Sequence, residues 1–435
     1  MNFLKKIFSP TALMISFLLL IYVFYKSEIY YNGYKREYYF DYYLIALSLT
    51  FFSIITFFIN QTIKEYLIIS GISLVVGIYL FEGYLTLKGV ISEDQLSKEQ
   101  LYEKQTGNKW DRRKTYEIYS DLKKKDNQIV MAVIPRIYLS ENKAIFSLAG
   151  VSNAKTLMCN ENGYYSMFQS DRYGFRNPDN EWDKKENEYL IVGDSFAFGS
   201  CVNEPNDIAS NLRSLSNKSV LNLGYAGNGP LIEYATLREY LNPNVKKVLF
   251  FYFEANDFRC LLEEKDNKIL INYLNDLNFS QNLKSKQNKI NELAIKEIER
   301  RIKSHKLRRF VTLINTRTNI RKSSQTSTPP PKPTPPPEFK KILELTKELT
   351  MKNNSKLYFI YLPEYYRYKT KYNNTNYNLV KDTVNKLNIP FIDIHKEVFE
   401  KEQNPLKLFP FGSVGHYNIK GYKKVAETIY QLTKD

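Results

Sequence analysis

Long uncharged runs are concentrated in the first ninety residues of the chain. No charged residue occurs from Ile7 to Tyr25 or from Tyr42 to Ile63, and a shorter uncharged run, Tyr66 to Phe81, is followed by Glu82. As a helix the first run extends about 28 Å, close to the ~30 Å hydrocarbon core of a bilayer. The pattern predicts a membrane anchor over residues 1–88, with transmembrane helices at about 7–25, 42–63 and 66–86.

After Asn187 short apolar runs alternate with segments of helical periodicity. This alternation is typical of a parallel β-sheet covered by helices. The clearest helix is the last one, where one face carries Tyr422, Val425, Ala426, Ile429 and Tyr430. Residues 188–435 are therefore predicted to form an α/β domain with a five-stranded parallel sheet. The expected strands are Tyr189–Val192, Ser219–Leu223, Val248–Phe253, Leu357–Leu362 and Pro390–Ile394.

One region precedes this predicted domain and another interrupts it. Residues 89–187 are polar, with a short strand-like run from Ile129 to Ile134, and we expect a connecting or accessory segment there. An insertion at about 261–337 separates the third and fourth expected strands. Within it, residues 289–307 have the spacing of an amphipathic helix, and Thr328–Pro337 is predicted to be a stiff polyproline II spacer.

The positive charge of the chain is concentrated in that insertion. The sequence contains 62 Lys+Arg and 46 Asp+Glu, a formal charge of +16, and the segment from Lys284 to Lys322 carries ten of these net charges. A basic face could contact anionic membrane lipid or an acidic glycan, and a solvated helix is the alternative interpretation. We expect no nucleic-acid partner, because the charge is confined to the insertion and no nucleic-acid-binding module is recognisable.

Candidate chemistry follows three of the expected strands. Gly193-Asp194-Ser195 places Ser195 at the carboxyl edge of the sheet, where open α/β sheets bind ligands. Gly227 and Asn256 follow the next two strands and could direct hydrogen-bond donors at an oxyanion. His416 lies in the loop before the last helix and could activate Ser195 as a general base. By itself, Gly-Asp-Ser would also fit an ordinary helix cap.

In this order the residues resemble the SGNH hydrolase superfamily, the GDSL-type esterases and lipases. Gly193-Asp194-Ser195 is similar to the first block of that family, Gly227 to the second, Asn256 to the third and His416 to the fifth. The resemblance implies an SGNH-like three-layer domain in which Ser195 is the nucleophile and His416 its base. It further implies that Gly227 and Asn256 line the oxyanion hole and that the substrates are carboxylic esters, often acyl groups on carbohydrates.

Two positions depart from the family pattern. Glu254 stands where the third block normally begins with Gly, and Ser413 stands where an Asp usually precedes the catalytic His. The third member of the triad is therefore open. Either His416 is oriented by a backbone carbonyl in a Ser–His dyad, or a carboxylate comes from elsewhere. Asp393, at the end of the fifth strand, is the nearest candidate, although a structural role fits it equally well.

The three cysteines leave a second alternative open. Cys159 and Cys201 flank the Ser195 block and would pair if the domain is exported, or else remain two thiols, while Cys260 stays single. No Cys/His cluster has metal-ligand spacing, so neither a metal nor another cofactor is expected. We assign no role to the segment from Asp171 to Pro178.

The location of the domain depends on the orientation of the anchor. Positively charged residues do not decide it, since Lys5, Lys6 and Lys64 fall on one side and Lys26, Lys35 and Arg36 on the other. A cleavable signal peptide is the alternative for the first run, but no small-residue cleavage site follows it. With three spans and the family resemblance, we expect the domain on the outer face of the cytoplasmic membrane.

The predicted function is that of a membrane-anchored serine ester hydrolase acting on acylated carbohydrate or another ester. An O-acyltransferase that uses the same Ser and His is one alternative, because water and a sugar hydroxyl can resolve the same acyl-enzyme. A non-catalytic glycan-binding or assembly module is the other, because the expected Asp is missing. The sequence does not indicate an oligomeric state.

Overall fold

The computed structural model describes residues 2–30, 33, 36–88, 93–139, 144–324, 334–370 and 374–434, so the Pro-rich spacer falls mostly outside the described residues. The chain divides into two compact units. Met1–Val90 and His305–Gln325 form what we call the anchor unit, and Ile91–Ser304 and Thr326–Asp435 form the α/β unit.

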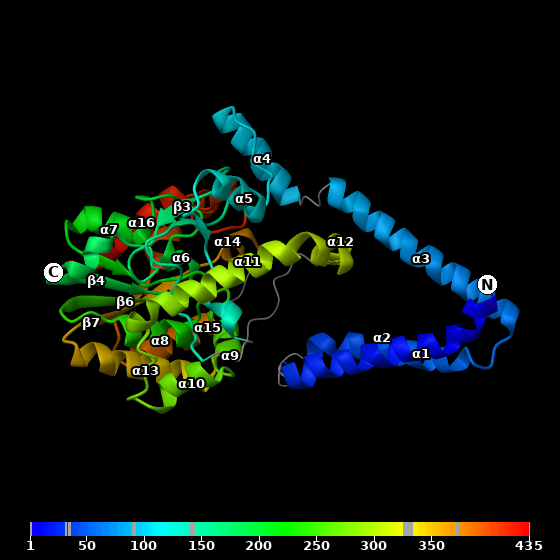
Figure 1. Ribbon diagram of the computed structural model, residues 1–435. Coiled ribbons are helices and arrows are strands. Elements are labelled where there is room, and N and C mark those ends of the chain that lie inside the picture. Colours follow the sequence, from blue (N-terminus) through cyan, green and yellow to red (C-terminus); the bar gives the residue numbers. More distant parts are fainter. Residues whose placement is uncertain are drawn as a thin grey trace. The chain divides into compact units, whose positions relative to one another are not determined.

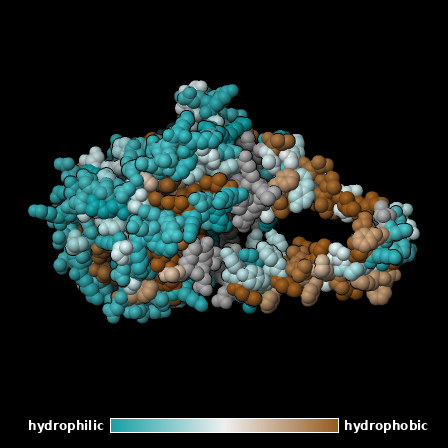
Figure 2. Space-filling model, viewed as in Figure 1, coloured by the Kyte–Doolittle hydropathy of each residue, from teal (hydrophilic) through white to brown (hydrophobic). Residues whose placement is uncertain are grey.

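The anchor unit contains three helices that are long and apolar enough to cross a membrane, which confirms the predicted number of spans. The second begins earlier and ends earlier than the predicted 42–63, because the chain turns after Ile55 and the third helix already starts at Gln61. Figure 2 shows hydrophobic side chains over these helices, in contrast to the mostly hydrophilic surface of the α/β unit in this view. Small residues make the contacts between the first two helices, which is typical of helix packing in lipid: Ser16 donates to Ser53 Oγ at 3.3 Å. The helices are α1 (Asn2–Phe24), continued by a π-helical segment (Tyr25–Tyr30), α2 (Arg36–Ile55) and α3 (Gln61–Lys88).

The α/β unit is built on a five-stranded sheet whose strands are all parallel, in the order β5-β4-β6-β7-β8. Figure 1 shows β4, β6 and β7 of this sheet side by side. All five expected strands are present. They are β4 (Asn187–Val192), β5 (Val220–Asn222), β6 (Val245–Phe253), β7 (Lys356–Leu362) and β8 (Phe391–Asp393). Because β5 and β6 lie on opposite sides of β4, the direction in which successive strands are added to the sheet reverses at β4, and this switch point is where open α/β sheets form ligand crevices.

Both faces of this sheet are buried, which gives three layers. Alternate residues of β4 enter separate cores: Leu190 and Val192 belong to one, and Tyr189 and Ile191 to the other. The first core is covered by α8 (Pro230–Tyr240) and α13 (Pro337–Lys352), and the second by α7 (Ile208–Ser216) and α16 (Ile419–Thr433). The apolar stripe predicted for the last helix is confirmed, since Tyr422, Val425, Ala426 and Ile429 are fully buried.

The structure does not separate residues 93–139 and 144–187 from the domain that follows them. Their small sheet, β1 (Val130–Met131), β2 (Lys155–Leu157) and β3 (Met167–Gln169), places Val130, Leu157 and Phe168 in the same core as Leu190 of β4. The boundary we expected near residue 187 is therefore not a boundary between compact units. Shared burial of apolar side chains joins the two segments. Two helices, α4 (Glu93–Thr106) and α5 (Thr115–Lys125), precede this sheet.

The insertion between β6 and β7 is helical and is divided between the two units. It contains α9 (Asp257–Glu264), α10 (Lys268–Asn275), α11 (Gln287–Val311) and α12 (Ile314–Ser324). The apolar stripe predicted on α11 is buried in the α/β unit through Ile290, Ala294 and Ile298. From His305 onward the insertion belongs to the anchor unit. Two further helices, α14 (Tyr366–Lys369) and α15 (Asn376–Lys386), follow β7.

Candidate catalytic site

Ser195 is the first residue of the short helix α6 (Ser195–Phe198), directly after the end of β4. The Asp194 side chain caps this helix by accepting a hydrogen bond from the Phe196 N–H at 2.9 Å. Burial raises the pKa of Asp194 to about 6. A glycine is required at 193, because a Cβ there would lie 2.7 Å from the Cβ atoms of Ala197 and Phe251. This tight turn presents the Ser195 hydroxyl at the carboxyl edge of the sheet.

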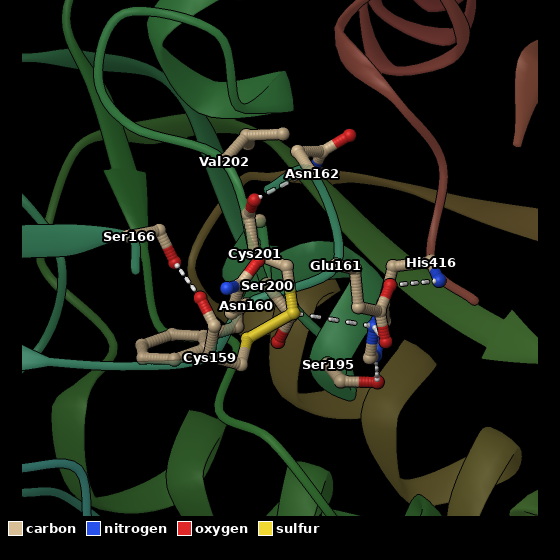
Figure 3. The surroundings of a disulfide bond; sticks show 12 residues. Cys159, Asn160, Glu161, Asn162, Ser166, Ser195, Ser200, Cys201, Val202 and His416 are labelled. Carbon is tan, nitrogen blue, oxygen red and sulfur yellow. Dashed lines mark hydrogen bonds and ion pairs between the residues drawn. A yellow bond between two sulfur atoms is a disulfide. The ribbon is translucent and has the colours of Figure 1, made fainter. Parts of the chain in front are cut away.

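Ser195 and His416 are brought together as the sequence predicts. Ser195 Oγ lies 2.8 Å from His416 Nε2, a hydrogen-bonding distance (Figure 3). On the other side of the ring, Nδ1 lies 3.0 Å from Oε1 of Glu161. Since an ionised carboxylate only accepts hydrogen bonds, these partners assign the proton to Nδ1 and leave Nε2 free to accept from Ser195. The three side chains form a Ser–His–Glu arrangement that can activate a hydroxyl nucleophile.

The electrostatics of the Glu161–His416 pair favour its charged form. Burial tends to raise the pKa of Glu161, but the charge of His416 and its hydrogen bonds outweigh burial and hold that pKa below its usual value. Burial tends to lower the pKa of His416, yet the Glu161 carboxylate outweighs it and raises the pKa of the imidazole. An imidazolium formed by taking a proton from Ser195 is therefore stabilised in place.

Glu161 is the site residue that sequence reasoning missed, and a disulfide holds its segment. Cys159 is bonded to Cys201, which follows Ser195 by six positions (Figure 3). Asn162 strengthens the connection by donating from Nδ2 to the Cys201 carbonyl at 2.9 Å. Of the two states left open for these cysteines, the structure has the pair. The possible pairing of Cys159 with Cys201 was the sequence signal that pointed to this segment, because a disulfide between them brings Glu161 next to the Ser195 loop.

The segment from Asp171 to Pro178, to which we assigned no role, fixes the loop that carries Cys201. The buried guanidinium of Arg176 donates to the carbonyl oxygens of Gly199 at 2.6 Å and Val202 at 3.1 Å. The buried carboxylate of Asp207 lies 3.4 Å from Arg176 Nη2 and balances its charge. Because a buried cation is costly without such partners, these contacts determine where the Cys201 loop lies.

Gly227 and Asn256 follow β5 and β6, the two neighbours of β4, so they flank Ser195 at the same sheet edge. Gly227 has a φ of 80°, which favours glycine at this turn. Asn256 occupies the cap position of α9, and its Oδ1 is buried without a hydrogen-bond partner among the described residues. Their place after the two strands beside β4 is compatible with the predicted role as oxyanion donors, which stays a prediction.

Asp393 does not occupy the place of the triad acid. It ends β8, an edge strand three positions from β4 in the sheet, which corresponds to about 14 Å at the usual strand spacing. Its carboxylate accepts hydrogen bonds from the Tyr377 hydroxyl and, at 3.3 Å, from the Lys396 N–H. In the structure Glu161 takes the position at His416 that we had considered for Asp393.

Glu254, the departure in the third block, has a structural explanation. Its buried carboxylate accepts hydrogen bonds from the Arg367 guanidinium, the Tyr361 hydroxyl at 2.5 Å and the Glu364 N–H at 2.9 Å. These contacts attach the segment after β7 to the end of β6. A glycine at this position could not make them.

One group of potential metal ligands coincides with this site. Glu161, Cys201 and His416 each offer a ligand atom, and these atoms lie within 4.8 Å of one another. The Cys201 sulfur is bonded to Cys159 and is not available as a thiolate, the form in which cysteine binds metal. The carboxylate and imidazole are already hydrogen-bonded to each other, so this group fits a triad better than a metal site.

Comparisons with known proteins add little to this geometry. No protein-family model matches the chain, and no curated protein matches it. One solved structure that matches is described as a lipolytic protein of the G-D-S-L family from Desulfitobacterium hafniense DCB-2, with a TM-score of 0.33 and 15% identity, covering 57% of this chain and 99% of that chain. At this TM-score and identity, the match supports no statement about the function of this chain.

Proposed function

We propose that the protein is a serine ester hydrolase in which Ser195 is the nucleophile, His416 the general base and Glu161 the residue that orients it. The observation that carries this proposal is the continuous hydrogen-bonded chain from Ser195 Oγ through both ring nitrogens of His416 to Glu161. A structural role for either residue alone would not explain this pair. A serine that only caps a helix needs no histidine at hydrogen-bonding distance, and a histidine that is only structural needs no serine at the switch point of a parallel sheet.

The reaction proceeds in two steps. Ser195 Oγ attacks the ester carbonyl carbon while His416 Nε2 takes the hydroxyl proton, and collapse of the tetrahedral adduct transfers that proton to the departing alkoxide and releases an alcohol. Water then attacks the acyl-enzyme and gives one proton to His416, which returns it to Ser195 Oγ as the carboxylic acid leaves. Glu161 stays ionised throughout and stabilises the imidazolium formed in each step.

The oxyanion of each tetrahedral adduct needs hydrogen-bond donors. We assign this role to the Gly227 N–H and the Asn256 side-chain amide, which follow the two strands flanking β4. Donors fixed in advance by a folded sheet edge stabilise the developing charge without reorganising at the moment of reaction. Removal of one such donor typically costs about 10²–10³-fold in kcat.

For location and substrate we propose the outer face of the membrane and acyl esters on cell-surface carbohydrate. The Cys159–Cys201 disulfide supports this location, because disulfides persist in oxidising compartments. The three apolar helices of the anchor unit would hold the enzyme at that surface. A sugar hydroxyl in place of water would turn the same acyl-enzyme into an O-acyltransferase intermediate.

The first experiment is labelling of the purified full-length protein with a fluorophosphonate, together with hydrolysis of p-nitrophenyl acetate. The Ser195→Ala variant is expected to abolish labelling, and His416→Ala to slow it strongly. Asp393→Asn is the matched control, since it neutralises a carboxylate that does not contact His416. Failure of well-folded wild-type protein to react would favour the non-catalytic module.

A second experiment separates hydrolysis from transfer. Wild-type protein is incubated with an activated acyl ester, with and without a polysaccharide acceptor, and free acid and acylated sugar are quantified. Free acid in both cases identifies an esterase. Acylated sugar formed at the expense of free acid, and lost in Ser195→Ala, identifies an O-acyltransferase.

A further inference from the structure

The last part of the β6–β7 insertion is bound to the anchor unit by specific contacts. Tyr79 of α3 donates from its hydroxyl to the Val311 carbonyl at 3.0 Å, and its ring lies 5.5 Å from that of Phe310. The segment His305–Gln325 therefore continues an insertion of the catalytic domain but packs on a helix that is apolar enough to span a membrane. We call this segment the surface segment.

A buried carboxylate fixes the start of α12 in the surface segment. Glu82 of α3 is fully buried and accepts hydrogen bonds from the N–H groups of Asn315 at 3.1 Å and Thr316 at 2.7 Å. Asn315 also donates from Nδ2 to Thr86 Oγ1, one turn further along α3, at 2.9 Å. The first N–H groups of a helix lack partners within it, so the carboxylate satisfies them and the α12 dipole favours its charge.

These contacts place α12 at the level where the apolar helices end. Glu82 and Thr86 lie in the last two turns of α3, which ends at Lys88. Arg317 of α12 donates from Nη2 to the hydroxyl of Tyr42, near the start of α2, at 3.3 Å. Tyrosines and arginines at the ends of spans are typical of the membrane–water interface. The surface segment therefore packs beside the ends of the apolar helices.

The composition of the surface segment matches that position. It contains six Lys/Arg and no Asp or Glu. Phe310, Val311 and Ile320 are nevertheless 38%, 54% and 61% exposed. Exposed apolar side chains beside cations are disfavoured in water but suit the headgroup region, where the apolar groups enter the acyl boundary and the cations meet phosphate.

From these observations we infer that the surface segment binds an anionic phospholipid surface. Arg309 and Arg317 contact lipid phosphates, and Phe310, Val311 and Ile320 insert beside the acyl chains. The Glu82 contacts hold the segment in register with the spanning helices. The insertion thereby attaches the α/β unit to the bilayer a second time, in addition to the N-terminal helices. This inference does not depend on the proposed esterase activity.

The test uses full-length Ile320→Cys protein carrying an NBD dye at that cysteine, reconstituted in nanodiscs. The discs contain either phosphatidylcholine alone or phosphatidylcholine with phosphatidylglycerol, each with a shallow spin-labelled lipid as quencher. We expect stronger quenching in the anionic discs, falling by about half in Arg309→Gln/Arg317→Gln and restored in Arg309→Lys/Arg317→Lys. Lys289→Gln/Lys296→Gln, which removes two exposed charges from α11 in the α/β unit, should leave quenching unchanged.

Two outcomes would overturn the inference. Equal, weak quenching in both kinds of disc would mean that the segment does not contact anionic lipid. A dye response to a soluble acidic polysaccharide, without lipid quenching, would assign the basic face to a glycan instead. Ester hydrolysis measured on the same samples distinguishes failure of lipid binding from failure of the proposed catalytic function.

Discussion

Glu161 holds His416 at two points, with one carboxylate oxygen 3.0 Å from the ring Nδ1 and the other accepting the backbone N–H of the same residue at 2.7 Å. The carboxylate therefore fixes both the ring and the loop that carries it. This double contact orients the His416 ring although the residue three positions before it, Ser413, offers no carboxylate. The acid comes from a segment before the nucleophile rather than from the loop before the histidine.

Replacing Glu161 by Gln should lower kcat for p-nitrophenyl acetate by about 10²–10⁴-fold, because Nδ1–H loses its charged acceptor and the imidazolium loses its counter-charge. KM should change little, since Glu161 lies behind the ring, away from Ser195. Asp393→Asn should leave kcat within about twofold of wild type, as expected for a site not coupled to the triad. A larger loss of kcat in Asp393→Asn than in Glu161→Gln would instead assign the orientation of His416 to Asp393.

Loss of the disulfide should reduce both stability and activity. The bond joins residues separated by 42 positions, and closing a loop of this size is worth about 4 kcal/mol in the chain-entropy model. The Cys159→Ser/Cys201→Ser protein should melt at a lower temperature, with lower kcat because the Glu161 segment is released. Dithiothreitol should reproduce this in wild type and add nothing in the double variant. Full activity of the double variant at low temperature would show that the disulfide does not position Glu161.

The pH dependence of kcat/KM should follow His416. Because the pKa of His416 is raised above its usual value of 6.5, chiefly by Glu161 acting against burial, the base is lost as pH falls through a midpoint above that value. In Glu161→Gln the acid limb should move to lower pH while the maximum falls. For stability, the raised pKa of His416 contributes fully below the pKa of the unfolded imidazole, and this contribution is lost as pH rises through the folded pKa. The lowered pKa of Glu161 contributes above the pKa of the unfolded carboxyl, and that contribution is lost as pH falls through the folded pKa. An acid limb that does not move would exclude His416 as the titrating base.

Lys98 of α4 should tune the same titration. It donates from Nζ to the carbonyl of Val414, two residues before His416, and its positive charge acts to lower the pKa of His416. Lys98→Met should therefore move the acid limb to higher pH, whereas Lys98→Arg, which keeps the charge, should not. If the acid limb of kcat/KM moves equally in both variants, the effect comes from packing and not from the charge of Lys98.

Asn256→Ala should lower kcat by about 10²–10³-fold without a matching rise in KM, because an oxyanion donor acts mainly in the transition state. Thermal unfolding of the variant should remain close to that of wild type, since Asn256 Oδ1 has no hydrogen-bond partner to lose among the described residues. A rise in KM at constant kcat would instead assign Asn256 to substrate binding.

The sequence by itself determined the elements whose signals are local. Runs of uncharged residues located α1, α2 and α3, and short apolar runs located β4 to β8, because burial on both faces of a parallel sheet or contact with lipid requires apolar side chains at adjacent positions. Gly193, Ser195 and His416 were likewise identified from the sequence, since a tight turn after a strand and a hydroxyl activated by an imidazole restrict the residue types.

Only the tertiary structure decided which acid serves His416 and where the insertion ends. Glu161 lies 34 positions before Ser195 and 255 before His416, in a segment without any local motif, and it reaches the site through the Cys159–Cys201 bond and the packing of residues 89–187 on the sheet. Glu82 and α12 meet across more than two hundred residues. Contacts of this kind depend on three-dimensional packing and leave no periodic trace in the sequence, whereas strands and helices do.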